Sequence, residues 1–153
     1  MSADDRTPTV RQLRLVVEAE DYDAAVAFFR DALGLPEQAA FSGAGDARVV
    51  ILDAGRATLE IANPAQKRMI DEVEVRQVAP KIRVAFEVDD AAAATARLVA
   101  AGATQIAPPT VTPWHSLNSR LDAPAGLQLT LFEELRDLDD RATLDGFGTD
   151  RER

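Results

Sequence analysis

The stretch "RVAFEVDD" at residues 83–90 has a near twin, "RLVVEAED", at residues 14–21. In both stretches apolar residues recur at every second position, which is typical of a β-strand with one face in an apolar layer. Each begins with an arginine and ends with an aspartate. Arg14 and Arg83 are 69 residues apart, as are Asp21 and Asp90. This spacing predicts that one structural unit is present twice in the chain.

A helix is predicted after each of these strands. Asp21 in the first copy, and Asp89 or Asp90 in the second, are suited to the N-cap because a carboxylate accepts hydrogen bonds from the free amides of the first turn. The segments that follow, "YDAAVAFFRDALG" and "AAAATARLVAAG", place apolar residues at helical spacing. Each ends in a glycine, Gly34 or Gly102, which is a natural helix stop.

Three short strands are predicted after each helix, because turn signals such as "GAGD", "DAG" and "DAPAG" divide the chain there. The expected strands are 37–42, 46–53 and 56–62 in the first half, and 103–107, 115–122 and 126–133 in the second. The predicted fold class is α+β: two βαβββ modules in tandem, 11–62 and 81–133, forming a cup-shaped, partly open mixed β-sheet barrel with helices outside. A linker over 63–80 begins as a helix at Pro64.

Composition narrows the function. The 153 residues carry a net charge of −9, which disfavours nucleic acid and anionic membranes as partners. The chain has no cysteine, so disulfides and thiolate metal sites are excluded. It lacks an apolar run of about 18 residues, and its start does not resemble a signal peptide. We expect a cytoplasmic protein with a flexible N-terminus (1–10) and a polar C-terminal tail (134–153).

One helix covers only one face of a four-stranded sheet, so the other face of each module must be buried or used. The predicted uncovered faces carry polar side chains: Arg14, Glu18, Thr58 and Glu60 in the first half, and Arg83, Glu87, Gln128 and Thr130 in the second. Two such sheets curling toward each other would line a cup with these groups.

The segments "LRLVVEAEDYDAAVAFFRDALGL", "ATLEI", "IRVAFEVDD" and "TPWHSLNSRLDAPAGLQLTLFE", in this order, resemble the vicinal oxygen chelate superfamily over residues 11–133. This superfamily includes glyoxalase I, extradiol dioxygenases and bleomycin-resistance proteins. The resemblance implies metal ligands, usually His, Glu, His or Gln, and Glu, at positions that here hold Arg14, Glu60, Arg83 and Thr130. A guanidinium has no free lone pair for a metal. We therefore expect no metal and no cofactor.

Two interpretations of these four residues stay open. Glu60 could bridge the two arginines as a purely structural network. Alternatively, the surplus positive charge, together with Thr130, could receive the carboxylate, phenolate or phosphate of a small ligand, because arginine presents paired donors. Three further residues are candidates for lining the cup: Trp114, as a stacking wall or a packing residue, and Asn118 and Arg120, on the strand face opposite Leu117 and Leu121. The run "DEVEVR" at 71–76 is expected to be a solvated face or a linker contact.

The leading hypothesis is a metal-independent, non-enzymatic binding protein of the bleomycin-resistance type, which takes a small anionic or aromatic ligand in the cup. Members of this superfamily typically dimerise, so a homodimer is expected. The alternative is a vicinal oxygen chelate enzyme, a lyase, isomerase or dioxygenase, with Glu60 as base or metal ligand. A non-catalytic interaction module that docks through its acidic tail is a third possibility.

Overall fold

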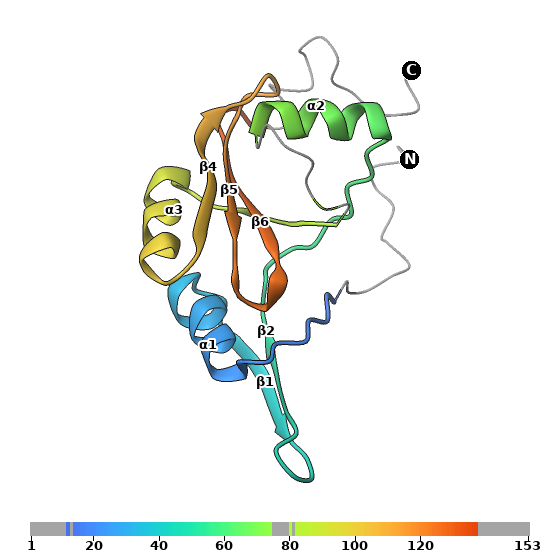
Figure 1. Ribbon diagram of the computed structural model, residues 1–153, viewed down its shortest axis with the longest axis vertical. Helices are drawn as coiled ribbons and strands as arrows, with labels where there is room; N and C mark the ends of the chain where they lie inside the picture. Colours follow the sequence, from blue (N-terminus) through green and yellow to red (C-terminus); the bar gives the residue numbers. More distant parts are fainter. Residues whose placement is uncertain (1–11, 13, 75–79, 81, 138–153) are drawn as a thin grey trace.

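The computed structural model describes residues 12, 14–74, 80 and 82–137. Its architecture is mixed α+β, as predicted, with a helix and a hairpin in the first half and a four-stranded sheet in the second (Figure 1). The predictions for residues 1–10, and for most of the tail beyond 134, concern residues outside the described part of the chain. None of the helices in the described part of the chain combines the length and the apolar composition that a membrane span requires.

The second half forms the predicted order of elements. Strand β3 (Val84–Glu87) leads into helix α3 (Ala91–Ala100), and β4 (Thr104–Val111), β5 (Ser116–Asp122) and β6 (Gln128–Glu134) follow. The sheet order is β3-β6-β5-β4, with β3 parallel to β6 and the other pairs antiparallel. A short 3-10 turn, η3 (Pro124–Gly126), joins β5 to β6 at the predicted "DAPAG" turn. The prediction of a strand, a helix and three strands over 82–133 is therefore confirmed.

The apolar face of this sheet packs against α3. Leu98 of α3 and Leu121, Leu129 and Leu131 of the sheet are fully buried in one cluster. Phe28, from the first half of the chain, is buried in the same cluster. The two halves of the chain thus share one core, and β5 and β6 present their alternate, polar residues to the opposite face.

Both predicted helix caps are present. The Asp21 carboxylate accepts a 3.1 Å hydrogen bond from the amide of Ala24 at the start of α1 (Tyr22–Val26). Asp90 accepts one of 3.0 Å from Ala93 at the start of α3. Helix α1 continues into a π-helical turn, η2 (Ala27–Ala32), before Gly34. Gly34 and Gly102 have φ values of 89° and 113°, a backbone conformation that favours glycine and ends each helix.

The first half is less regular than predicted. It contains a two-stranded antiparallel hairpin, β1 (Glu37–Ser42) and β2 (Arg48–Leu52). Residues 14–19 and 56–62 have no regular secondary structure, so the strand predictions for these two segments are wrong for this structure. Alternation of apolar residues indicates an extended segment with one apolar face, but a strand also needs a hydrogen-bonded partner, and local sequence does not specify one. Within the described residues only the second βαβββ module is complete, and no closed barrel is present.

The linker contains the predicted helix, α2 (Pro64–Glu74). Asn63 caps it, because its side-chain oxygen accepts a 2.9 Å hydrogen bond from the amide of Gln66. Figure 1 shows α2 and α3 on opposite sides of the sheet. The buried residues of α2 are Ile70, Asp71 and Glu74, so the side that faces the sheet is largely acidic. Helix α2 therefore covers part of the polar face that the predicted cup leaves open.

Candidate functional site

The strand alternation of β5 places its polar side chains toward α2. Ser119 and Leu121 point to the other face, where the Ser119 hydroxyl lies 2.7 Å from that of Thr95 in α3. Asn118 and Arg120 point to the α2 face, and both are buried. The predicted orientation of Asn118 and Arg120, away from Leu121, is thus confirmed.

Arg120 is the centre of a hydrogen-bonded network on this face. Its side chain is fully buried, and it donates through all three nitrogens. Nε donates to Thr130 Oγ1 at 3.0 Å, Nη1 donates to Gln128 Oε1 at 2.8 Å, and Nη2 donates to Glu74 Oε2. Residues 120 and 130 are direct partners in the β5–β6 ladder, which sets this geometry.

Glu74, at the end of α2, supplies the only carboxylate that pairs with Arg120 among the described residues. Its side chain is 1% exposed. Its second oxygen, Oε1, accepts a 2.7 Å hydrogen bond from Asn118 Nδ2. The Asn118 oxygen in turn accepts from Ser116 Oγ at 2.6 Å, and the Ser116 and Thr112 hydroxyls lie 3.0 Å apart. The Glu74 carboxylate is therefore bound by one cation and one amide, like a ligand anion.

Arg83, just before β3, brings a second cation to the same place. Its Nη1 donates to Thr130 Oγ1 at 2.9 Å, so Arg83 and Arg120 share one acceptor oxygen. The Arg83 side chain is half-buried, and among the described residues it forms no ion pair. Arginine stays protonated in proteins. Arg83 is thus a partly desolvated cation with donors still available.

The electrostatics of Arg120 reflect this crowding. Burial lowers its pKa, the Glu74 carboxylate opposes that change, and the positive charge of Arg83 lowers the pKa further. Lys67 and Asp71 of α2 form a 2.7 Å ion pair beside this cluster. Counted over these five described side chains, three cations face two carboxylates, within a chain whose net charge is −9. These five side chains together carry a net charge of +1, and Arg83 and Arg120 lie at their centre.

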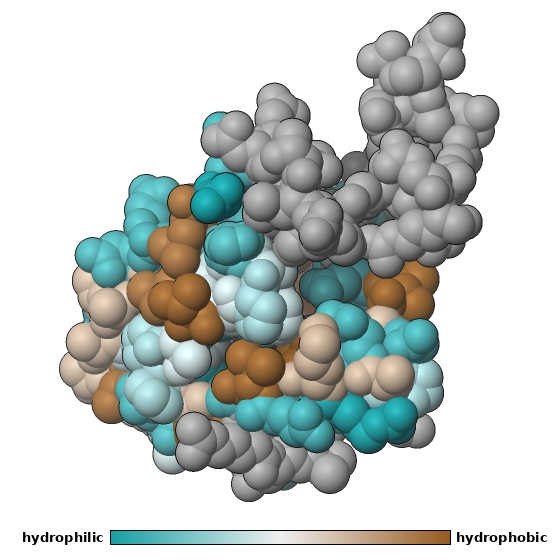
Figure 2. Space-filling model, turned by 90° about the horizontal axis from the view of Figure 1, so that it is seen from above, coloured by the Kyte–Doolittle hydropathy of each residue, from teal (hydrophilic) through white to brown (hydrophobic). Residues whose placement is uncertain are grey.

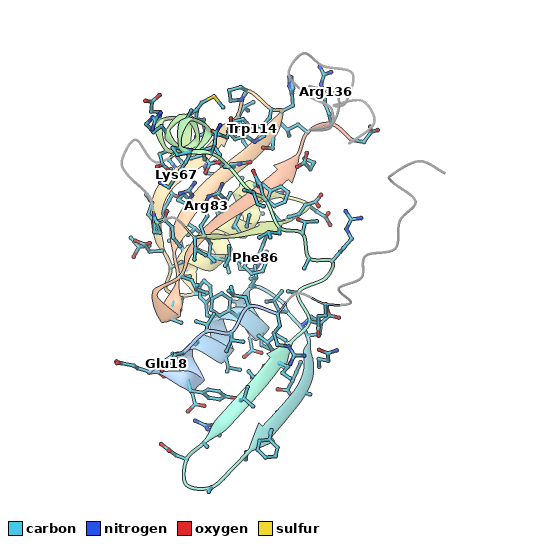
Figure 3. All side chains as sticks on the ribbon, turned by 90° about the vertical axis from the view of Figure 1, so that its right-hand side faces the viewer. Glu18, Lys67, Arg83, Phe86, Trp114 and Arg136 are labelled. Atoms are coloured by element: carbon cyan, nitrogen blue, oxygen red, sulfur yellow. The ribbon has the colours of Figure 1, made fainter. Side chains whose placement is uncertain are left out.

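Figure 3 shows this arrangement, with Arg83 on the sheet next to α2 and Lys67 on the helix. Trp114 lies at the α2 end of the sheet, in the loop before β5, and is half-buried. Glu18 lies beside α1, well away from Arg83 and Trp114. The polar network and the aromatic ring therefore lie toward one end of the molecule, and Glu18 lies toward the other.

The structure brings four of the seven predicted site residues into one network: Arg83, Thr130, Asn118 and Arg120. Arg14 is exposed and donates to Gln12 at 3.3 Å, and Glu60 is exposed in a segment without regular structure. Within the described residues no hydrogen bond or ion pair joins Arg14 or Glu60 to Arg83 or Thr130. A ligand-binding role for any of the seven stays a prediction.

Sequence reasoning did not single out Glu74. The charge pattern of the run at 71–76 predicts a solvated face or a linker contact, whereas Glu74 is buried against β5. A signal was present, because Lys67, Ile70, Asp71 and Glu74 recur at the i, i+3, i+4, i+7 spacing of one helix face. Strand alternation predicts Gln128 on the polar face, but it does not predict the hydrogen bond that Gln128 accepts from Arg120.

These residues do not fit the metal that the superfamily resemblance implies. The Arg83 guanidinium and the Thr130 hydroxyl bond to each other, and neither is a good donor to a divalent ion. Among the residues that the structure describes, no group of three or more His, Asp or Glu side chains is placed to hold a metal. Arg83 and Thr130 are therefore unsuited to act as metal ligands.

A separate cleft of about 370 Å³ lies between α1 and the β1–β2 hairpin. Its charged groups pair with one another: Arg48 with Asp23 at 3.1 Å, and Arg30 with Glu37 at 3.4 Å. The Arg48 guanidinium also stacks on the Tyr22 ring, 4.3 Å from its centre. These cations already have exposed partners, so the sheet face with Arg83 is the stronger candidate site.

The βαβββ order, the β3-β6-β5-β4 sheet and the polar face opposite α3 agree with the module expected from the resemblance to the vicinal oxygen chelate superfamily. The family model described as a glyoxalase-like domain matches residues 14–132, and the chain belongs to this family. This confirms the expected relationship to the vicinal oxygen chelate superfamily. A search of curated proteins found no match.

Solved structures with the same fold share little sequence with this chain. A glyoxalase/bleomycin resistance protein/dioxygenase superfamily member from Sphaerobacter thermophilus is 22% identical, with a TM-score of 0.50 over 78% of this chain and 92% of that one. TnmS3, an antibiotic binding protein from a Streptomyces species, is 19% identical, with a TM-score of 0.50 over 84% and 99%. A protein of unknown function from Agrobacterium tumefaciens is 19% identical, with a TM-score of 0.51 over 83% and 98%. At these identities the similarity establishes the fold alone.

Proposed function

We propose that the protein binds a small anionic ligand without a metal, on the polar face of the β3-β6-β5-β4 sheet. The observation that carries the proposal is Arg83, a half-buried cation that donates to Thr130 and has no ion-pair partner among the described residues. Leaving a charge partly desolvated is unfavourable unless an anion compensates it. A ligand carboxylate, phenolate or phosphate would supply that compensation through paired hydrogen bonds.

Trp114 extends the proposed site. The ring is half-buried at the end of the sheet that α2 also occupies (Figure 3). A flat ligand that placed its anionic group at Arg83 could stack against an indole there, because aromatic rings favour offset or edge contacts. We therefore favour an aromatic acid as the ligand class. The antibiotic binding protein TnmS3 has the same fold, so this fold can support binding.

The enzyme alternative is not favoured. It needs Glu60 as a base or a metal ligand, and Glu60 is exposed and outside the polar network. A general base must lie within hydrogen-bond reach of the proton it removes. No such arrangement links Glu60 to Arg83 or Thr130 in the described part of the chain.

The proposal is tested by titrating salicylate into the protein by calorimetry, with salicylamide as the neutral analogue. Salicylate is expected to bind in the presence of EDTA, and salicylamide at least tenfold more weakly. Arg83→Gln should weaken salicylate binding at least tenfold. The matched control is Arg30→Gln, which removes the same charge from the cleft between α1 and the hairpin and should change affinity less than twofold.

Two results would contradict the proposal. One is that Arg30→Gln weakens salicylate binding and Arg83→Gln does not, which would indicate that salicylate binds in the cleft between α1 and the hairpin. The other is a thermal-shift screen in which micromolar Zn²⁺, Mn²⁺ or Fe²⁺ stabilises the protein while salicylate does not, which would point to metal chemistry.

A further inference from the structure

We propose that Glu74 is an internal competitor: its carboxylate occupies an anion-binding position formed by Arg120 and Asn118, and a ligand carboxylate takes that position by displacing the end of α2. This inference rests on the proposed binding function and adds a second anchor to the site, beyond Arg83. It also makes ligand binding depend on the position of a helix.

The first support is the way Glu74 is bound. One carboxylate oxygen accepts from Asn118 and the other from Arg120, and the side chain is 1% exposed. This is the arrangement that a protein uses to hold the carboxylate of a ligand, with a guanidinium and an amide as donors. Here the carboxylate comes from a helix in the linker rather than from a bound molecule.

The second support is the weak apolar attachment of α2. Of its eleven residues, the buried ones are Ile70, Asp71 and Glu74, and two of these are acidic. Elements with few buried apolar contacts open at a lower free-energy cost than core elements do. The contacts that hold the end of α2 are therefore mostly polar. An incoming anion could take the place of the Glu74 carboxylate at Asn118 and Arg120.

The third support is the charge balance. Arg83 and Arg120 donate to the same Thr130 oxygen, and among the described side chains Glu74 forms its ion pair with Arg120 only. The nearby positive charge of Arg83 acts on Arg120 and lowers its pKa. A ligand carboxylate placed between the two guanidiniums could accept from both, whereas Glu74 is fixed to one by its place on the helix. The ligand therefore has an advantage that offsets the loss of the Glu74 contacts.

The test compares Glu74→Gln with Glu72→Gln by salicylate calorimetry. Both variants remove one carboxylate from α2, but Glu72 is exposed and Glu74 is buried on the sheet. Glu74→Gln is expected to bind salicylate at least tenfold more tightly than the unaltered protein, and Glu72→Gln within twofold of it. Adding Arg120→Gln to Glu74→Gln should abolish the gain.

Hydrogen exchange of the unaltered protein gives a readout that does not depend on how well a variant folds. Saturating salicylate should accelerate amide exchange in the second half of α2 at least threefold while slowing it in β5. Unchanged or slower exchange in α2, with Glu74→Gln binding no more tightly than Glu72→Gln, would overturn the competitor role. If binding still depended on Arg83, the proposed function would stand; no binding to any form would overturn both.

Discussion

Arg120 is the residue on which the polar face depends most. It is fully buried, and it links α2, β5 and β6 through hydrogen bonds to Glu74, Gln128 and Thr130. A buried ion pair contributes little relative to an apolar replacement, but losing one partner is costly because the other charge is left buried and unpaired. Replacing only one partner of the Arg120–Glu74 pair should therefore lower the stability of the protein more than replacing both with apolar residues.

We predict that Arg120→Met lowers the free energy of unfolding by about 3–5 kcal/mol, because the Glu74 carboxylate is left buried without its cation. Urea denaturation measures the change. Arg120→Met combined with Glu74→Met should recover a large part of the loss. The control Arg48→Met removes a cation from an exposed pair with Asp23 and should have a much smaller effect. A loss as small in Arg120→Met as in Arg48→Met would contradict the prediction.

Some of this residue-level picture could be predicted from the sequence. The period-two alternation in "SLNSRLD" places Asn118 and Arg120 on one face, and the structure confirms that orientation. The partner Glu74 could not be predicted, because it comes from a charged run 44 residues before Asn118 and a charged run on a helix is usually solvated. The helical spacing of Ile70 and Glu74 indicates a shared face but not what that face contacts.

At the level of elements, helix α3 depends on its first turn. The Asp90 carboxylate accepts from the amide of Ala93 at 3.0 Å, and Glu133 of β6 accepts from the amide of Ala91 at 2.9 Å. Two amides that would otherwise lack partners are thus satisfied, one by the N-cap residue and one by the sheet. The β6 contact also fixes the start of α3 against the sheet.

We predict that Asp90→Ala destabilises the protein by about 0.5–2 kcal/mol, the usual cost of losing an N-cap carboxylate. Chemical denaturation with a two-state fit would measure it. Asp89→Ala is the matched control, because Asp89 is exposed and Asp90 is the N-cap. Equal losses in the two variants would show that the cap does not determine the stability of the helix.

The sequence predicted the elements of the second half better than those of the first. Strands β4, β5 and β6 are joined by short turns, and tight turns bring antiparallel neighbours together directly. Segments 14–19 and 56–62 would have to be parallel neighbours across a long stretch of chain, as β3 and β6 are. The alternation of apolar residues predicts a strand in both segments, but the sequence of neither segment specifies the strand with which it would pair.

At the level of the whole molecule, the surface carries large apolar side chains. Val16, Leu59, Ile61 and Ile82 are between 75% and 87% exposed. Figure 2, viewed from the α2 end, shows brown apolar areas among the teal polar ones. Scattered apolar residues are normal on a surface, but several that are almost fully exposed favour an interface with another chain. They fit the expectation that this family member is a homodimer.

We predict that the protein elutes as a dimer in size-exclusion chromatography with light scattering at micromolar concentration. The combination Leu59→Glu and Ile61→Glu should convert it to a monomer, because burying charge at an interface is unfavourable. Val99→Glu, on the exposed side of α3, is the control and should leave the dimer intact. A monomer at all concentrations, or a dimer that the combined Leu59→Glu and Ile61→Glu change leaves intact, would contradict the prediction.

The hydroxyl of Thr130 has a consequence for which chemical groups the face can accept. A hydroxyl has two lone pairs and one hydrogen. Both lone pairs of Thr130 Oγ1 are engaged, since the oxygen accepts from Arg83 at 2.9 Å and from Arg120 at 3.0 Å. Its hydrogen remains the one group that the hydroxyl can donate. A group seated between the two arginines therefore meets N–H donors, and a carboxylate, which has only acceptors and carries the opposite charge, satisfies them better than a neutral amide or alcohol does.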